Sequence, residues 1–331
     1  MIPFNYRWIG GALAGPNFEG ESKASLPLFD LASLTKVICT FSLLAKDALE
    51  SNLKEDYFDS TLLQELPSLA STQLSDLTIR ECLEHRSGLP AHFLFFNPSR
   101  RPPFALNERA KLHDFLLEKI AKATRETGAQ TVYSDIGFIL LAVYLEVKHG
   151  RTIANLWDEW RSENLPGNNQ LNFEALDTSC LNPTESRYSF GEVNDDNCRG
   201  MNSISSHAGL FGRAEDVWSW LKAIQVLFDN NPWLSSAVLS GGERFHLGWD
   251  SPSAPLHDSQ AGSLATSFVR GHLGYTGTAL WWDLKSARAG VLLSNRVCPV
   301  ADDESKQRIK ELRQRFFNAV WDESLDESFS F

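Results

Sequence analysis

The chain has 331 residues, of which 43% are hydrophobic and 22% charged, and this balance excludes a disordered chain. Lysine and arginine number 31 against 42 aspartate and glutamate residues, giving a formal net charge of −11. An acidic surface repels phosphate backbones and anionic lipid, so we expect neither nucleic acid nor a membrane surface as a partner.

The five cysteines are odd in number and form no CxxC pair. Because zinc clusters and disulfide frameworks need paired cysteines, we expect free thiols, no metal and no cofactor. The N-terminus lacks a basic segment followed by an apolar one, and no apolar run approaches the roughly 18 residues that span a bilayer. These features predict a cytoplasmic location, or a periplasmic one if a leader is missing from the sequence.

The first predicted elements are a short strand over 6–14 and a long helix within 29–50. The helix is expected to begin near Ser33, because apolar residues from Val37 to Ala48 recur at helical spacing. Helical patterns then dominate the middle of the chain, at 76–85, 107–123, 136–148 and 214–228. Short strands are then predicted at 245–249, 267–270, 278–283 and 290–294. An amphipathic helix over 303–321 closes the chain.

Strands therefore lie at both ends of the chain, with helices between them. This order predicts one α/β (α+β) domain over 1–331, with an antiparallel sheet flanked by the first and last helices. An α/β lobe would comprise about 1–55 plus 243–325, and a mostly helical lobe about 56–242 would be inserted into it. A cleft between two lobes is a natural place for a small-molecule site.

Ser33 and Lys36 frame an SxxK sequence, SLTK, at the expected start of the long helix. The same spacing occurs at Ser51 and Ser219, so it has little meaning alone. Ser33 differs because it lies at a helix N-terminus, near unpaired N–H groups, with Lys36 about one turn away on the same face. Burial would lower the lysine pKa and let a neutral amine take the serine proton. The alternative is a helix-capping serine beside an exposed lysine.

Two later motifs complete a candidate site. Tyr133 and Asp135 lie just before the helix 136–148, where Asp135 is the expected N-cap and Gly150 the stop. Residues 272–278 (HLGYTGT) are rich in glycine, which lets a substrate backbone approach an edge strand closely. Taken alone, these would be a packed tyrosine and an ordinary turn with a surface histidine.

Together and in this order, the three motifs resemble those of the serine β-lactamases, D-alanyl-D-alanine carboxypeptidases and related esterases. The class C-like branch of this superfamily has SxxK, then YxN or YxD, then KTG or HxG, where this chain has SLTK, YSD and HLG. Neighbouring segments also match: 29–36 (FDLASLTK), 85–90 (HRSGLP), 206–211 (SHAGLF), 247–250 (LGWD), 271–278 (GHLGYTGT) and 292–296 (LLSNR). The resemblance runs from about residue 8 to 320 and implies a β-lactamase/transpeptidase-like fold.

The resemblance also implies roles for individual residues. Ser33 would form an acyl-enzyme, Lys36 would activate it as general base, and Tyr133 would relay protons. His272 would take the place of the KTG lysine, as a cation that titrates near neutrality. The oxyanion would be bound by the backbone N–H groups of Ser33 and Tyr275, the latter following Gly274.

Two departures from the family pattern bear on the substrate. Asp135 stands where lactamases commonly have an asparagine that donates to a substrate carbonyl, and an ionised carboxylate cannot donate. Leu273 stands where KTG has a threonine that holds the substrate carboxylate. Together with His272, these changes predict weak recognition of anionic groups. We therefore expect small esters, amides or D-peptides as substrates, rather than β-lactams.

Two other functions stay open. One is a D-alanyl-D-alanine carboxypeptidase, a weak penicillin-binding protein or a β-lactamase. The other is a catalytically silent binding protein on the same fold, which a pocket blocked by Phe95, Phe96 or the loop 100–103 would favour. The acidic segment with Glu192, Asp195 and Asp196 is expected to be an exposed loop, and His207 part of a buried turn. The oligomeric state is not predicted.

Overall fold

The computed structural model describes residues 4–8, 28–97, 100, 102–126, 131–173, 191–240, 244–286, 288–298 and 301–322. Two antiparallel sheets are present in this part of the chain. The larger has the strand order β1-β8-β7-β6-β5-β4 and the smaller pairs β2 with β3. The strands are β1 (Phe4–Trp8), β2 (Phe29–Asp30), β3 (Phe211–Gly212), β4 (Phe245–His246), β5 (Trp249–Asp250), β6 (Val269–Leu273), β7 (Ala279–Asp283) and β8 (Ala289–Ser294).

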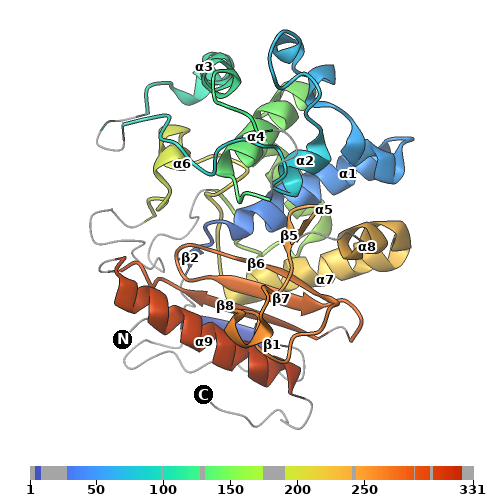
Figure 1. Cartoon of the computed structure of the whole chain (residues 1–331), viewed down its shortest axis with the longest axis vertical. Helices are drawn as coiled ribbons and strands as arrows, with labels where there is room; N and C mark the ends of the chain where they lie inside the picture. Colours follow the sequence, from blue (N-terminus) through green and yellow to red (C-terminus); the bar gives the residue numbers. More distant parts are fainter. Residues whose placement is uncertain are drawn as a thin grey trace.

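The expectation that strands from both ends join one antiparallel sheet is confirmed. β1 pairs with β8 in the register Phe4 to Ser294, and β8 pairs in turn with β7. This places the start of the chain beside its last strand (Figure 1). The mixed α/β architecture with an antiparallel sheet is thus as the sequence predicts.

Helices cover both faces of the larger sheet, as the alternation of buried side chains requires. On β7, Leu280 and Trp282 pack into the main core, which includes residues of α7 (Ala214–Asn230). Trp281 points to the opposite face and packs into a second core with α9 (Asp303–Trp321). Figure 1 shows α7 and α9 on opposite sides of the sheet.

The remaining helices lie on the α7 side of the sheet (Figure 1). A turn at Ala32 and Ser33 leads into a helical segment whose π-helical part is Lys36–Phe41. The other α-helices are α1 (Ser42–Glu50), α2 (Ile79–Leu83), α3 (Arg109–Ala121), α4 (Asp135–His149), α5 (Ile153–Asn164), α6 (Asp196–Gly200) and α8 (Pro232–Leu239). Short 3₁₀ turns occupy Lys54–Asp59, Leu62–Gln64, Pro67–Leu69, Leu106–Glu108 and Leu256–Asp258.

Several predicted boundaries were wrong for local reasons. The single strand expected over 245–249 is two strands, because Leu247 and Gly248 both adopt positive φ and form a tight turn. The N-cap of α4 is Ser134 and not Asp135, which is the first helical residue. Gly150 ends α4 in the left-handed conformation, as predicted.

The division into two lobes stays a prediction. α7 falls within the predicted helical lobe, yet it packs against the sheet. In the described ranges, none of the helices combines the length and apolar character that crossing a bilayer requires.

Candidate active site

Ser33 lies in a kinked turn between β2 and the π-helical segment. The preceding residue, Ala32, has φ +48°, a conformation that costs energy for any residue with a side chain. The buried carboxylate of Asp30 stabilises this turn, because its Oδ1 accepts a hydrogen bond of 2.8 Å from the Ala32 N–H. Burial raises the pKa of Asp30 to about 6, against the lowering effect of the Asn194 and Ala32 N–H groups.

Lys36 is completely buried and donates three hydrogen bonds. Its Nζ lies 3.0 Å from Ser33 Oγ, 2.7 Å from Asp135 Oδ1 and 3.1 Å from the backbone carbonyl oxygen of His207. Lys36 is the first residue of the π-helical segment, an irregularity that often occurs at functional sites. The predicted neighbourhood of Ser33, Lys36 and Asp135 is therefore formed.

The predicted lowering of the Lys36 pKa is wrong. Burial does disfavour the charged amine, but the adjacent Asp135 carboxylate and the Tyr133 hydroxyl outweigh it and raise the pKa above its ordinary value. The same ion pair keeps the pKa of Asp135 below its ordinary value, although burial opposes this. Lys36 is thus charged in the resting structure.

Tyr133 precedes α4 and faces both Lys36 and His272. Lys36 Nζ lies 5.0 Å from the centre of its ring, and the ring centres of Tyr133 and His272 are 5.9 Å apart. The Tyr133 ring also packs against His85, and the centres of these two rings are 4.4 Å apart. Burial of the hydroxyl raises the pKa of Tyr133, and Lys36 only partly offsets this, so the phenol stays protonated.

His272 lies on β6 and is 2% exposed. Its Nδ1 is 2.8 Å from the carbonyl oxygen of Leu273, so this nitrogen carries the proton and donates it. Burial, with Lys36 nearby, lowers the pKa of His272 to about 3. The expectation of a cation that titrates near neutrality is therefore wrong, and His272 is a neutral imidazole.

The turn after β6 is fixed from two sides. Thr276 Oγ1 and Thr278 Oγ1 donate to the carbonyl oxygens of Asp30 and Leu31, at 2.7 and 3.0 Å. These bonds attach the turn to the segment that carries Ser33. On the other side, buried Arg313 of α9 donates to the carbonyl oxygens of Gly274 and Thr278, at 2.8 and 2.6 Å.

Gly274 is required by this packing. A Cβ atom at this position would lie 1.9 Å from Thr278 Oγ1 and 2.8 Å from the carbonyl oxygen of Leu31. The next residue, Tyr275, is 58% exposed, and the Arg296 guanidinium lies 4.5 Å from the centre of its ring. The backbone N–H groups of Ser33 and Tyr275 donate to no acceptor within the described residues.

Two cavities meet at Ser33. The larger has a volume of about 660 Å³ and is lined by Ser33, Tyr133, His272, Tyr275 and residues of α9. The smaller has about 380 Å³ and shares Ser33, Tyr133 and Tyr275 with the larger one. Both lie near the usual size range of ligand pockets. Neither Phe95 nor Phe96 lines them, so these rings do not block the described site.

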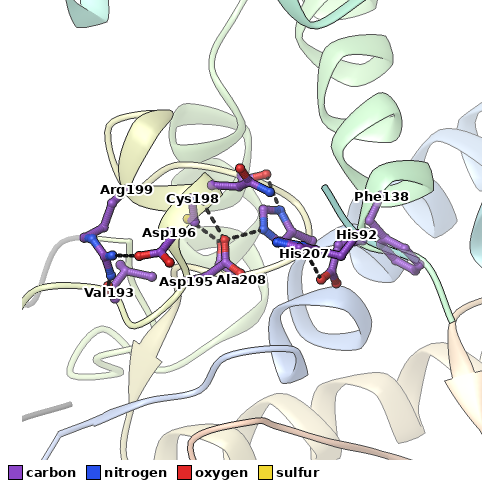
Figure 2. Close-up of polar contacts among 12 residues, drawn as sticks. His92, Phe138, Val193, Asp195, Asp196, Cys198, Arg199, His207 and Ala208 are labelled. Carbon is purple, nitrogen blue, oxygen red and sulfur yellow. Dashed lines mark hydrogen bonds and ion pairs between the residues drawn. The ribbon is translucent and has the colours of Figure 1, made fainter. Parts of the chain in front are cut away.

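His207, whose carbonyl oxygen accepts from Lys36, is itself held by two polar side chains. The His207 ring is buried, with Nδ1 2.8 Å from Ser205 Oγ and Nε2 2.8 Å from Asp195 Oδ1. Asp195 also accepts a bond of 2.7 Å from the Cys198 N–H and so caps α6, while Asp196 pairs with Arg199 (Figure 2). The acidic segment was expected to be an exposed loop; Glu192 is exposed, but Asp195 and Asp196 are partly buried at the start of α6.

The structure brings all the predicted site residues together around the two cavities, namely Ser33, Lys36, Tyr133, Asp135, His272, Gly274 and Tyr275. Asp30, Arg313 and the carbonyl of His207 were missed. Asp30 and His207 lie in the segments 29–36 and 206–211, which match the family. No sequence pattern, however, predicts that a carboxylate will be buried or that a main-chain carbonyl will accept from a lysine. In the sequence, Arg313 cannot be distinguished from the other charged residues of the amphipathic helix 303–321.

Comparisons with known proteins agree with this geometry. A family model described as Beta-lactamase matches residues 27–314. An N-acetylmuramyl-L-alanine amidase of Bacillus subtilis is 27% identical over 327 residues, covering 86% of this chain and 71% of the relative. A putative D-alanyl-D-alanine carboxypeptidase of Escherichia coli is 25% identical over 331 residues, covering 87% and 73%.

Solved structures show the same fold at lower identity. A class C β-lactamase from Rhodobacter sphaeroides has a TM-score of 0.62 and 15% identity, over 96% of this chain and 94% of that one. EstCE1, described as a hydrolase with promiscuous acyltransferase activity, has a TM-score of 0.63 and 17% identity, over 97% and 93%. The family match over most of the sequence and the shared fold show that this chain belongs to the β-lactamase family of serine hydrolases.

Proposed function

We propose that the protein hydrolyses small esters or amides through an acyl-enzyme on Ser33. The observation that carries this proposal is the 3.0 Å hydrogen bond between Lys36 Nζ and Ser33 Oγ at the junction of two open cavities. A serine hydroxyl needs an adjacent base to become a nucleophile, and Lys36 is the basic group within reach.

The reaction would proceed in two stages. Ser33 Oγ attacks the substrate carbonyl carbon while its proton passes to Lys36 in the neutral form of that side chain. The oxyanion accepts hydrogen bonds from the N–H groups of Ser33 and Tyr275, which have no acceptor within the described residues. Tyr133 relays the proton to the leaving group, and a water molecule then cleaves the acyl-enzyme. Asp135 favours charged Lys36, so the rate rises with pH.

His272 would contribute as a neutral acceptor. Its proton is on Nδ1, so Nε2 is a hydrogen-bond acceptor, and His272 lines the larger cavity. This position suits an N–H or O–H group of the substrate better than an anion.

Labelling of Ser33 tests the proposal directly. The protein is incubated with a chromogenic short-chain ester and, separately, with a fluorophosphonate, and the intact mass is measured. We expect ester turnover and a mass increase located on Ser33, and neither with Ser33→Ala. A folded wild-type protein with no turnover and no adduct would refute the proposal.

A second candidate is a D-alanyl-D-alanine carboxypeptidase, as the name of the Escherichia coli relative suggests. It is favoured by Arg296 and Lys306, which line the larger cavity and supply positive charge where the HLG motif lacks it. A fluorescent penicillin distinguishes this function. Covalent labelling of Ser33 would support it, and no labelling at high penicillin concentration would count against it.

A further inference from the structure

His92 lines the smaller cavity beside Ser33, on the connection between α2 and α3. Its side chain is 43% exposed, and Nδ1 lies 3.7 Å from Oδ2 of Asp135. The other oxygen of this carboxylate, Oδ1, accepts the 2.7 Å bond from Lys36. One carboxylate thus lies between the proposed base and a titratable imidazole that takes no part in the acyl-transfer steps.

The backbone on both sides of His92 is attached to the rest of the site. Before it, the carbonyl oxygen of Ala91 accepts a 3.0 Å bond from the N–H of Asp135. After it, the carbonyl oxygen of Phe93 accepts a 2.9 Å bond from the side chain of Asn197 in α6. These bonds keep the imidazole next to the residue whose carboxylate it faces.

The other titratable side chains of this cavity come from the start of α4, the start of α6 and the segment before β3: Tyr133, Asp135, Asp195, Asp196 and His207. Figure 2 shows that Asp196 pairs with Arg199 and that His207 pairs with Asp195. Both contacts lie away from the Asp135 carboxylate, which Lys36 and His92 share.

The charge on His92 depends mainly on Asp135. This adjacent carboxylate raises the pKa of His92 above its ordinary value, and Asp195 adds to the effect. Partial burial and the charge on Lys36 oppose the rise without cancelling it. His92 therefore loses its proton at a pH above 6.5, its ordinary pKa.

A charge on His92 changes the protonation of Lys36. Lys36 lowers the pKa of His92, and because such coupling is reciprocal, a charged His92 lowers the pKa of Lys36. More of Lys36 is then neutral, which is the form that accepts the Ser33 proton in the proposed mechanism. Once His92 is neutral, this effect disappears.

We propose that His92 is a positioning residue that shares the Asp135 carboxylate with Lys36 and thereby sustains acyl transfer at and below neutral pH. This proposal rests on the acyl-enzyme function of Ser33 and adds a group that acts through its base. No proton passes between His92 and Lys36. Each side chain exchanges its own proton with solvent, and only their charges interact.

The pH dependence of acylation tests the proposal. Hydrolysis of an uncharged chromogenic ester and labelling by a fluorophosphonate are measured at several pH values. His92→Gln should slow both by roughly threefold or more near pH 6, since a fall of about 0.5 in the Lys36 pKa triples its neutral fraction. Near pH 9 it should change neither. His92→Lys, which stays charged, should keep the wild-type rate near pH 6 and exceed it near pH 9.

His257→Gln is the matched control, because the side chain of His257 is 77% exposed and lines neither cavity. It should change the rate at neither pH. An equal loss at both pH values in His92→Gln would mean that His92 only supports the loop, and no loss at either would mean that it is uncoupled. Either result would overturn the proposal, as would a His92→Lys protein that behaves like His92→Gln near pH 6.

An NMR titration of the His92 imidazole tests the coupling without activity. Its signal is assigned by its loss in His92→Gln. The pKa of His92 should fall in Asp135→Asn and rise in Lys36→Met, because these changes remove the groups that raise and lower it. An unchanged pKa in both variants would overturn the proposal even if Ser33 is reactive. The expected changes in a protein whose Ser33 is never acylated would support the coupling and refute the acyl-enzyme function.

Discussion

Lys36 Nζ lies 2.7 Å from Asp135 Oδ1 and 3.0 Å from Ser33 Oγ, so the proposed base lies closer to a carboxylate than to the proposed nucleophile. The pair is buried on the lysine side, where an ionic interaction is weakly screened. Asp135 therefore determines how much of Lys36 is neutral at a given pH. In the proposed mechanism, Asp135 thereby regulates the reactivity of Ser33.

Replacing Asp135 with asparagine should move the pH dependence of ester hydrolysis. The carboxylate raises the pKa of Lys36, so its removal lowers that pKa. Because neutral Lys36 is the reactive form, the rise in kcat/KM should shift to lower pH, and the rate near pH 7 should increase severalfold. The measurement is a pH–rate profile of wild-type protein and Asp135→Asn. A loss of activity at every pH in the folded variant would show that the carboxylate itself carries the proton.

Arg313 should affect catalysis through its hydrogen bonds to the turn after β6, which carries Tyr275. Arg313→Lys removes the guanidinium group that donates to the carbonyl oxygens of Gly274 and Thr278, in the turn that carries Tyr275. Since losing one oxyanion donor costs about 10²–10³ in kcat, a displaced donor should cost about tenfold in kcat with little change in KM. Steady-state kinetics test this against Arg308→Lys, an exposed site on the same helix. A change in KM alone would contradict it.

Gly274→Ala should destabilise the protein and slow acylation together. The added methyl group would displace the Thr278 hydroxyl from the carbonyl oxygen of Leu31. Overpacking of this kind costs about 1–3 kcal/mol. Thermal unfolding and fluorophosphonate labelling measure the two effects. Gly167→Ala, where an added methyl group meets no atom within 4 Å, is the control, and equal behaviour of the two variants would refute the packing argument.

Two of the buried histidines, His85 and His272, should make the fold sensitive to acid. The pKa values of His85 and His272 are both lowered by burial, that of His272 from 6.5 to about 3. Between about pH 6.5 and pH 3 the unfolded chain binds more protons at His272 than the folded protein does. The contribution of these histidines to the free energy of unfolding is therefore fully present above about pH 6.5 and is lost as the pH falls. Each histidine contributes a slope of about 1.4 kcal/mol per pH unit.

Denaturant unfolding at several pH values tests this prediction. His272→Asn should flatten the decline between pH 6 and 4 by about one histidine's contribution, whereas the exposed His257→Asn should not. Identical slopes for wild-type protein and His272→Asn would contradict the assigned burial effect.

The sequence predicted those features that depend on local patterns. The long helix after Ser33, the helix 303–321 and the strands of the larger sheet follow from periodicity, and the three motifs converge as the family resemblance implies. α5, α6 and α8 were missed. α8 has eight residues, and a run this short shows little periodicity of its own.

The electrostatics of the site could not be predicted, because they depend on contacts between distant segments. Burial around Lys36 was foreseen, but the direction of its pKa shift was not, since a carboxylate 99 residues away overrides burial. His272 was expected to titrate near neutrality because the sequence does not reveal that its side chain is buried. Part of the positive charge in the larger cavity comes from Lys306, Lys310 and Arg313 of α9, and no sequence motif indicates that this helix faces the site.

The attachment of Thr276 and Thr278 to the carbonyl oxygens of Asp30 and Leu31 has a consequence during synthesis. These bonds join positions about 246 residues apart, and Arg313 secures the same turn from a still later point. Ser33 leaves the ribosome early, but the Tyr275 N–H, an oxyanion donor in the proposed mechanism, is positioned only after α9 has folded. In that mechanism a nascent chain carries Ser33 without its reactivity, and acylation of Ser33 would report that the chain has folded through α9.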